Sequence, residues 1–143
     1  MGILVRKAFI KDFTAVYQFI CELQGKVFDK ETMSTLYSEN ISNPNYIYLV
    51  ACDDNTAVGY ASCHTQNLLH HAGKVAEVQE MFVKPTYRSN GVGKLLMDEL
   101  KKIAKEKGAL QLEVTTRALR EKAIQFYVRE HFEDSHKKLV HYF

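Results

Sequence analysis

The residues with the clearest chemical potential form a loop in the middle of the chain, Arg88-Ser89-Asn90-Gly91-Val92-Gly93. An apolar run that ends at Val83 precedes the loop, and an amphipathic pattern begins directly after it. A loop of small residues at a helix start presents unpaired N–H groups and the positive end of the helix dipole. The two glycines allow the backbone to approach a bulky anion, and Arg88 adds a permanent positive charge. The segment therefore predicts a pyrophosphate-binding site.

Other interpretations of the same loop are a simple tight turn and two nucleotide-binding motifs. Considered alone, the loop could equally be a simple tight turn, so this interpretation is not excluded. A dinucleotide-binding fingerprint requires a third glycine and a place at the beginning of the domain. A Walker loop requires Gly-Lys followed by Ser or Thr, whereas Gly93-Lys94 is followed by Leu95. Both nucleotide-binding motifs are therefore excluded.

Hydrophobic periodicity and turn residues predict the elements that position this loop. Asp12 and Asp29 are predicted to cap two early helices, the second of which reaches about Ile41. Asp53-Asp54-Asn55 predicts the turn of a hairpin, and Gly108 predicts the end of the helix that follows the loop. The other predicted elements are strands at 3–7, 46–52, 57–67, 74–83, 110–115 and 132–142 and helices at 91–107 and 121–130.

The predicted order of these elements is β-α-α-β-β-β-α-β-α-β. Antiparallel hairpins come first, and a later β-α-β crossover requires a parallel pair of strands. The predicted fold class is therefore α/β, with a mixed sheet that is covered by helices on both faces. No repeat, linker or change of composition divides the 143 residues, so we expect one domain, 1–143.

Composition excludes several classes of partner. The net charge of +2 is too small to predict binding to nucleic acid or to an anionic membrane. Asp98, Glu99 and Glu106 are interspersed with the basic residues Lys101, Lys102, Lys105 and Lys107, which is typical of a solvated helix face. No apolar run approaches the ~18 residues that cross a bilayer, and the first residues lack a signal-peptide pattern. Three scattered cysteines predict reduced thiols, and the protein is expected to be cytoplasmic.

The pattern Arg88-x-x-Gly91-x-Gly93 after a strand in the middle of the domain resembles motif A of the GNAT (Gcn5-related N-acetyltransferase) superfamily. The resemblance covers nearly the whole chain and includes the preceding strand, the long helix and Ala123-x-x-Phe126-Tyr127. It implies the GNAT fold, with a partly splayed sheet and about four helices. It also implies transfer of an acetyl group from acetyl-CoA to a primary amine, and a homodimer as the family habit.

A set of short segments is also similar to the aminoalkylphosphonate N-acetyltransferases. The similarity implies a small polar amine, and specifically an aminoalkylphosphonate, as the acceptor. Alternative acceptors are a polyamine, an aminosugar or a protein amine, and a non-catalytic acyl-CoA-binding module is a further alternative. The segments are Tyr17-x-x-Ile20-Cys21-Glu22-Leu23, Phe28-Asp29, Asn43-Pro44-Asn45, Leu69-His70-His71, Glu77-Val78-Gln79-Glu80 and Phe126-Tyr127.

The superfamily resemblance also assigns roles at the cofactor. The pantetheine arm is expected to pair with the main chain of the strand before the loop, and Tyr127 is expected to protonate the departing thiolate. Simple aromatic packing beside Phe126 is the alternative for Tyr127. Two departures from the family pattern, Arg120 in place of Asn and His131 in place of Gly, weaken the contacts implied around Tyr127. The expected cofactor-binding residues are Met81, Phe82, Val83, Arg88, Ser89, Asn90, Gly91, Val92, Gly93, Lys94, Ala123 and Phe126.

The acceptor amine must lose a proton, and Glu77 and Glu80 are the candidate bases. Strand alternation predicts Glu77 and Gln79 on one face and Glu80 on the other, unless a bulge intervenes. The family face implied for the acceptor favours Glu77. Solvated or ion-paired carboxylates are the alternative, and an acceptor that arrives neutral would need no base.

The remaining predicted acceptor contacts are Gln79, Glu80, His70 and His71. The two histidines precede the strand of Glu77 and are either turn residues or partners of a phosphonate, together with Arg117 or Arg120. The aminoalkylphosphonate resemblance carries an association with divalent metals. No ligand spacing in the sequence indicates a metal site, so none is predicted.

Overall fold

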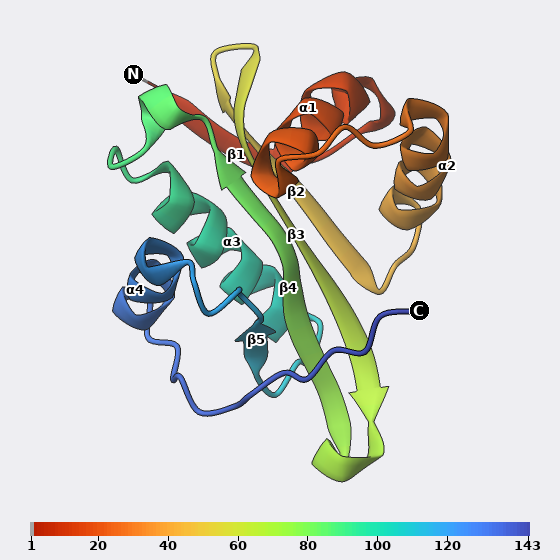
Figure 1. Cartoon of the computed structure of the whole chain (residues 1–143), viewed down its shortest axis with the longest axis vertical. Helices are drawn as coiled ribbons and strands as arrows, with labels where there is room; N and C mark the ends of the chain where they lie inside the picture. The colour runs from red at the N-terminus through yellow and green to blue at the C-terminus, as the bar shows by residue number, and fades with distance from the viewer. Residues whose placement is uncertain (1) are drawn as a thin grey trace.

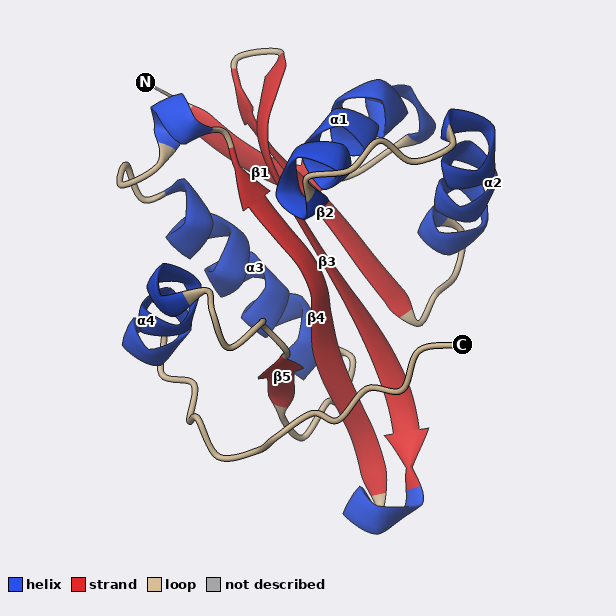
Figure 2. Ribbon diagram, viewed as in Figure 1, coloured by secondary structure: helices blue, strands red, loops and turns tan. Residues whose placement is uncertain are grey.

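A five-stranded mixed sheet in the order β1-β2-β3-β4-β5 forms the centre of the computed structural model, which describes residues 2–143 (Figures 1 and 2). The first four strands pair antiparallel, and β4 pairs parallel with β5. The strands are β1 (Ile3–Lys7), β2 (Tyr46–Asp53), β3 (Thr56–Leu68), β4 (Gly73–Val83) and β5 (Leu112–Val114). The helices are α1 (Phe13–Gln24), α2 (Lys30–Ile41), α3 (Val92–Glu106) and α4 (Glu121–Arg129).

Helices cover both faces of the sheet, as predicted. On one face, Val16 and Phe19 of α1 and Tyr37 of α2 pack against an aromatic set that includes Tyr60 and Phe82. On the other face, α3 buries an apolar stripe against the small side chains of β3 and β4. That stripe consists of Val92, Leu96, Met97, Leu100 and Ala104. The two cores hold the middle of β3 and β4 between layers, and this fixes the strands that carry the predicted site.

The contact between β4 and β5 is short, and this leaves β4 with an open edge. Only Ala76–Val78 pair with Leu112–Val114, whereas β4 continues to Val83 (Figure 1). Lys84 donates its N–H to the carbonyl of Val58 on β3 (2.8 Å). Successive residues of an antiparallel strand direct their main-chain N–H and C=O groups to opposite edges. Since Lys84 bonds to β3, the N–H and C=O groups of Met81 and Val83 point to the open edge of β4. The predicted partly splayed sheet is confirmed.

A bulge in β4 changes which side chains share a face. Ser62 pairs with Glu80 and Cys63 pairs with Val78, so Gln79 is the extra residue. Glu80 and Glu77 therefore lie on the same face of the sheet, the face that α1 and α2 cover. The expected arrangement, with Glu77 and Gln79 together and Glu80 opposite, is wrong because the bulge shifts the alternation by one residue.

Two other expectations are corrected. The strand predicted over 132–142 is not formed, and residues 133–143 are exposed. The polar run from Glu133 to Lys138 offers no alternating apolar face, and β5 is too short to pair with a long strand. Asp12 precedes α1 but does not cap it, because its carboxylate accepts the Phe9 N–H (2.7 Å) and two hydrogen bonds from Arg6.

The other boundaries agree with the prediction to within a few residues. Asp29 caps α2 as expected, and Gly108 adopts the left-handed conformation (φ +88°) just after α3. Among residues 2–143, no helix combines the length and apolarity that crossing a bilayer requires.

The buried stripe of α3 yields a stability prediction. Leu96 is fully buried between α3 and the sheet, so Leu96→Ala should lower the free energy of unfolding by about 3 to 5 kcal/mol. Leu69→Ala, at a side chain that is 98% exposed, is the matched control and should change it by less than about 0.5 kcal/mol. Urea unfolding followed by circular dichroism measures both values. Equal losses in the two variants would contradict this core assignment.

Candidate active site

The predicted pyrophosphate loop follows β4 after a single 3-10 turn, Pro85–Tyr87, and leads into α3. Ser89 and Gly91 both have positive φ angles (+66° and +82°), and Gly91 is the N-cap of α3. The first helical bond runs from the Leu95 N–H to the Gly91 carbonyl (3.1 Å). No acceptor within residues 2–143 is in hydrogen-bonding geometry for the N–H groups from Ser89 to Lys94. The loop and helix start therefore offer a concave row of free donors that suits a multiply charged anion.

Side chains at both ends of the loop fix its position. The Tyr87 hydroxyl donates to Asp53 Oδ2 (2.6 Å), which ties the loop to the turn between β2 and β3. Arg88 Nε donates to the carbonyl of Val83 (2.8 Å), and its guanidinium lies over the Phe82 ring. The cation thus lies between the open edge of β4 and the free N–H groups.

The two glycines of the loop, Gly91 and Gly93, are required for different structural reasons. A Cβ atom on Gly91 would meet nothing within 4 Å, so its positive φ is what requires glycine there. A Cβ atom on Gly93 would lie 3.3 Å from two ring atoms of Phe126. Gly93 therefore lets α4 approach the start of α3, so the predicted cofactor residues Gly93 and Phe126 lie side by side.

Tyr127 follows Phe126 on α4 and is half-buried at the same junction. Its ring makes edge-to-face contacts with Phe126 and Phe132, with centroids 5.3 and 5.7 Å apart. Its hydroxyl has no hydrogen-bond partner among the described residues and is not sealed from solvent. Burial raises the pKa of Tyr127, and the positive charge of Arg120 opposes that shift. The phenol is therefore neutral at physiological pH and free to donate a proton.

The bulge brings the two predicted acidic residues to one face of the sheet but gives them different environments. Glu80 Oε1 accepts hydrogen bonds from the Ser62 hydroxyl (2.5 Å) and the Tyr60 hydroxyl (3.2 Å). Glu77 Oε2 accepts one from Thr115 Oγ1 (3.1 Å), just after β5 ends. Glu80 is thus held against the buried wall of the sheet, whereas Glu77 lies within the short β4–β5 pairing, one residue before it ends at Val78.

His64 is a site residue that the sequence prediction missed. It lies directly opposite Glu77 in the β3–β4 pairing and stacks on the ring of Tyr46, with centroids 3.6 Å apart. Its Nε2 is 3.1 Å from the Tyr48 hydroxyl, which in turn accepts a hydrogen bond from Asn40 (2.8 Å). Burial lowers the pKa of His64, and the charges of Glu80 and Glu77 oppose that shift.

A signal for this residue was present in the sequence. The polar side chains of Tyr60, Ser62, His64 and Gln66 alternate along a strand that is otherwise apolar. Such alternation places them on one face, and a polar row on a strand that two layers cover indicates a functional surface.

A hollow of about 180 Å³ lies beside His64 on this face of the sheet. It contains two carboxylates, one imidazole and two amides, so its wall is mainly polar. The residues that line it are His64, Gln66, Leu68, Val75, Glu77, Gln79 and Glu113. His70 and His71 are not among them, because they form the turn at the tip of the β3–β4 hairpin. The structure therefore brings Glu77 and Gln79 together with His64, and it leaves the tandem histidines outside.

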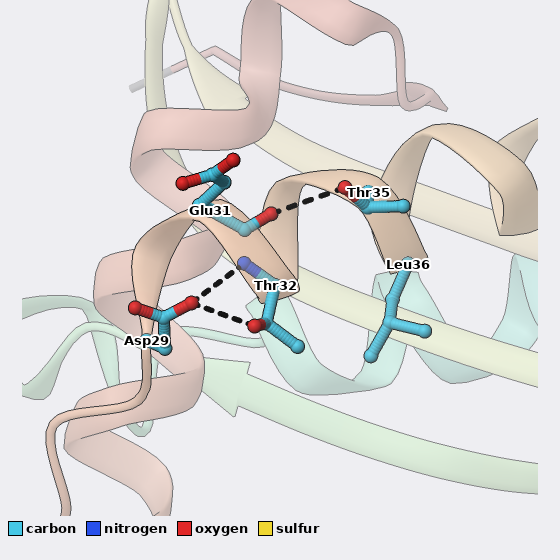
Figure 3. Close-up of a pocket in the computed structure, with 5 residues that line it drawn as sticks. All are labelled: Asp29, Glu31, Thr32, Thr35 and Leu36. Atoms are coloured by element: carbon cyan, nitrogen blue, oxygen red, sulfur yellow. Dashed lines mark hydrogen bonds between the residues drawn. The ribbon is translucent and has the colours of Figure 1, made fainter.

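A hollow of about 400 Å³ lies at the start of α2 and is lined by Asp29, Glu31, Thr32, Thr35 and Leu36 (Figure 3). Asp29 Oδ2 accepts hydrogen bonds from the Thr32 N–H (2.9 Å) and hydroxyl (2.6 Å), so the helix start is already capped. All five residues are exposed and come from one end of one helix. This hollow is therefore a feature of the α2 surface and includes no residue of β4 or of the predicted pyrophosphate loop. Separately, residues 2–143 contain no cluster of three or more His, Cys, Asp or Glu side chains arranged to bind a metal ion.

Comparison with known proteins agrees with this geometry. The acetyltransferase (GNAT) family matches residues 12–132. An aminoalkylphosphonate N-acetyltransferase of Salmonella typhimurium is 34% identical over 132 residues, which cover 92% of this chain and 86% of that protein. Both matches extend over most of the length of this chain.

Two solved structures show the same fold. A Bacillus halodurans protein described as a transcriptional regulator superposes with a TM-score of 0.91 at 22% identity, covering 99% of this chain and 100% of that one. Glucosamine-6-phosphate N-acetyltransferase of Arabidopsis thaliana has a TM-score of 0.85 at 16% identity, with 100% and 99% covered. The chain is thus a member of the GNAT family, an enzyme that transfers an acetyl group from the cosubstrate acetyl-CoA.

Proposed function

We propose that this enzyme acetylates the primary amine of a small anionic acceptor of the aminoalkylphosphonate class, at the open edge of β4. The observation that carries the proposal is the 34% identity to an aminoalkylphosphonate N-acetyltransferase over 92% of the chain. The placement of one permanent positive charge, Arg120, between α1 and Tyr127 agrees with an anionic acceptor.

The cosubstrate fits the groups that the protein leaves unpaired. The free N–H groups from Ser89 to Lys94 would bind the pyrophosphate, and the main chain of Met81 and the N–H of Val83 would pair with the amides of the pantetheine arm. Phe126, which packs on Gly93, would close the other side of that arm. When bound, acetyl-CoA supplies a thioester whose carbonyl carbon the acceptor amine attacks.

Two side chains on opposite sides of this edge would move the protons. Glu77, one residue before the β4–β5 pairing ends, would take a proton from the acceptor ammonium. Tyr127, on the α4 side, would protonate the departing thiolate, and the second proton that the attacking nitrogen loses as the amide forms would restore the phenol. Burial raises the pKa of Tyr127, so its proton is retained throughout the neutral range. Glu80, which two hydroxyls hold in place, would orient the acceptor rather than take its proton.

Arg120 is the group that we assign to the acceptor anion. Its Nη2 donates to the Leu23 carbonyl near the end of α1 (3.1 Å), so the guanidinium spans from α4 to the helix that covers Phe82. A guanidinium can form two parallel hydrogen bonds to a phosphonate. The tandem histidines are less suited, because Gly73, where β4 leaves their turn, is about 13 Å along the strand from Glu77.

A polyamine is the second candidate acceptor. Glu77 and Glu113 both line the hollow beside His64, and two carboxylates in one hollow would attract a second ammonium group. The cytoplasmic location and the homodimer expected from the sequence stay predictions.

A panel of amines tests the acceptor class. With acetyl-CoA, an aminoalkylphosphonate should give the highest kcat/KM, above spermidine and an aminosugar, as measured by release of free thiol. Arg120→Gln should lower kcat/KM for the phosphonate by about 10- to 100-fold, because a hydrogen-bonded charge is lost, and should change the value for spermidine little. Arg129→Gln, at an exposed arginine of the same helix, is the matched control.

The acceptor proposal is overturned if spermidine gives the highest kcat/KM and Arg120→Gln leaves the order of the amines unchanged. Coenzyme binding with no thiol release for any amine would instead indicate a non-catalytic acyl-CoA-binding module.

Variants of the acid and the base test the assigned roles. Tyr127→Phe and Glu77→Gln should each lower kcat by about 10²- to 10⁴-fold, whereas Glu80→Gln should mainly raise KM for the acceptor. Because burial raises the pKa of Tyr127, the loss of wild-type activity at high pH should set in above about pH 10. Tyr142→Phe, at a side chain that is 84% exposed, is the control. Full activity in Tyr127→Phe would remove this residue from the mechanism.

A further inference from the structure

We infer that His64 is a proton-relay residue of the acceptor site, which takes onward the proton that Glu77 removes from the acceptor ammonium. The inference rests on the proposed acceptor site beside Glu77. His64 acts through Glu77, so it is not itself assigned to contact the acceptor.

The geometry places the imidazole where a relay needs it. His64 and Glu77 are directly paired across β3 and β4, and both line the same hollow. Cβ atoms of directly paired residues are about 4.5–5.5 Å apart, within reach of a proton transfer between the two side chains, either direct or through one water. On its other side, Nε2 is bonded to the Tyr48 hydroxyl (3.1 Å). The second ring nitrogen is therefore the one that exchanges a proton with Glu77.

The contacts of His64 also hold the ring in one orientation. Its ring is nearly parallel to that of Tyr46, at an interplanar angle of 9°. Asn40 of α2 donates to the Tyr48 hydroxyl, so the relay is tied to the layer that covers the sheet. A surface histidine without such contacts would turn freely, and its ring would not stay beside Glu77.

The charged and titratable groups around His64 come from three neighbouring strands. Tyr46 and Tyr48 belong to β2, Glu77 and Glu80 to β4, and Glu113 to β5 on the far wall of the hollow. Burial lowers the pKa of His64, whereas the two β4 carboxylates oppose the shift. Burial raises the pKa of Tyr48 to about 12, so its hydroxyl stays neutral.

The proton path balances as follows. The acceptor ammonium gives one proton to the Glu77 carboxylate, and the nitrogen lone pair becomes available for attack. The Glu77 carboxyl then passes that proton to the neutral imidazole, which becomes an imidazolium beside two carboxylates. Glu77 returns to its ionised form, and His64 releases the proton to solvent through the hollow. No oxidant, reductant or further reactant is required.

The pH profile of His64→Gln tests the relay. In the wild type, kcat/KM should fall at acidic pH as the imidazole becomes protonated before it can accept the relayed proton. Since burial lowers the pKa of His64, that loss should set in below the ordinary histidine range of about 6.5. His64→Gln should lower kcat by about 10- to 100-fold at neutral pH and should remove this step from the profile. His136→Gln, at an exposed histidine of the C-terminal segment, should keep the wild-type kcat and the acidic step of the profile.

Tyr48→Phe provides a second variant in case His64→Gln fails to fold. It keeps the aromatic packing and removes only the hydroxyl bonded to Nε2, so the acidic step should move and kcat should fall at least severalfold. An unchanged kcat and an unchanged acidic step in either folded variant would overturn the relay. If Glu77→Gln also has full activity, the proposed acceptor site is wrong, whereas loss of activity in Glu77→Gln alone leaves that site in place without the relay.

Discussion

The short pairing between β4 and β5 is the constraint on which the rest of the site depends. Three residues of β5 pair with β4 and then β5 ends, so the edge of β4 that faces away from β3 has no strand beside it from Gln79 to Val83. Unpaired main-chain groups within a protein need a partner, and an extended molecule with amides can supply one. One 3-10 turn, Pro85–Tyr87, connects this strand to the loop whose N–H groups are also free. One uninterrupted segment thus presents an open edge and an anion-binding end.

The bulge at Gln79 is the second feature that makes the site, because it selects the side chains that meet there. A regular β4 would place Glu77 and Glu80 on opposite faces, one of them against the apolar stripe of α3. With one extra residue, both carboxylates lie on the face that α1 and α2 cover. There, Ser62 and Tyr60 donate hydrogen bonds to Glu80, and His64 lies opposite Glu77. Bulges are common beside active sites for this reason. The proposed acid, Tyr127, packs against the apolar core on the α3 side of the sheet. The proposed base, Glu77, lies on the opposite face with the polar row of β3, so the two are separated.

Much of this arrangement could be predicted from the sequence, and the parts that could not have physical causes. The loop from Arg88 to Gly93, the helix after it and the preceding strand carry local signals, namely glycine positions and apolar periodicity, and all were found. The sequence prediction named a bulge only as an exception to strand alternation and did not place it, because the bulge depends on pairing with β3 rather than on residues near Gln79. His64 was missed although polar residues alternate along its strand, because its place opposite Glu77 depends on the pairing of β3 with β4. The strand predicted over 132–142 failed because pairing requires a partner that local sequence does not report.

The central claim is that the cosubstrate occupies the open edge of β4 and the start of α3. An amide NMR titration of the uniformly ¹⁵N-labelled protein with coenzyme A tests it most directly. The largest shift changes should fall on the amides of Met81 and Val83 and on those from Ser89 to Lys94, with small changes at the start of α2. Saturable shifts confined to α2 or to the β3–β4 hairpin tip, with these amides unchanged, would contradict the account.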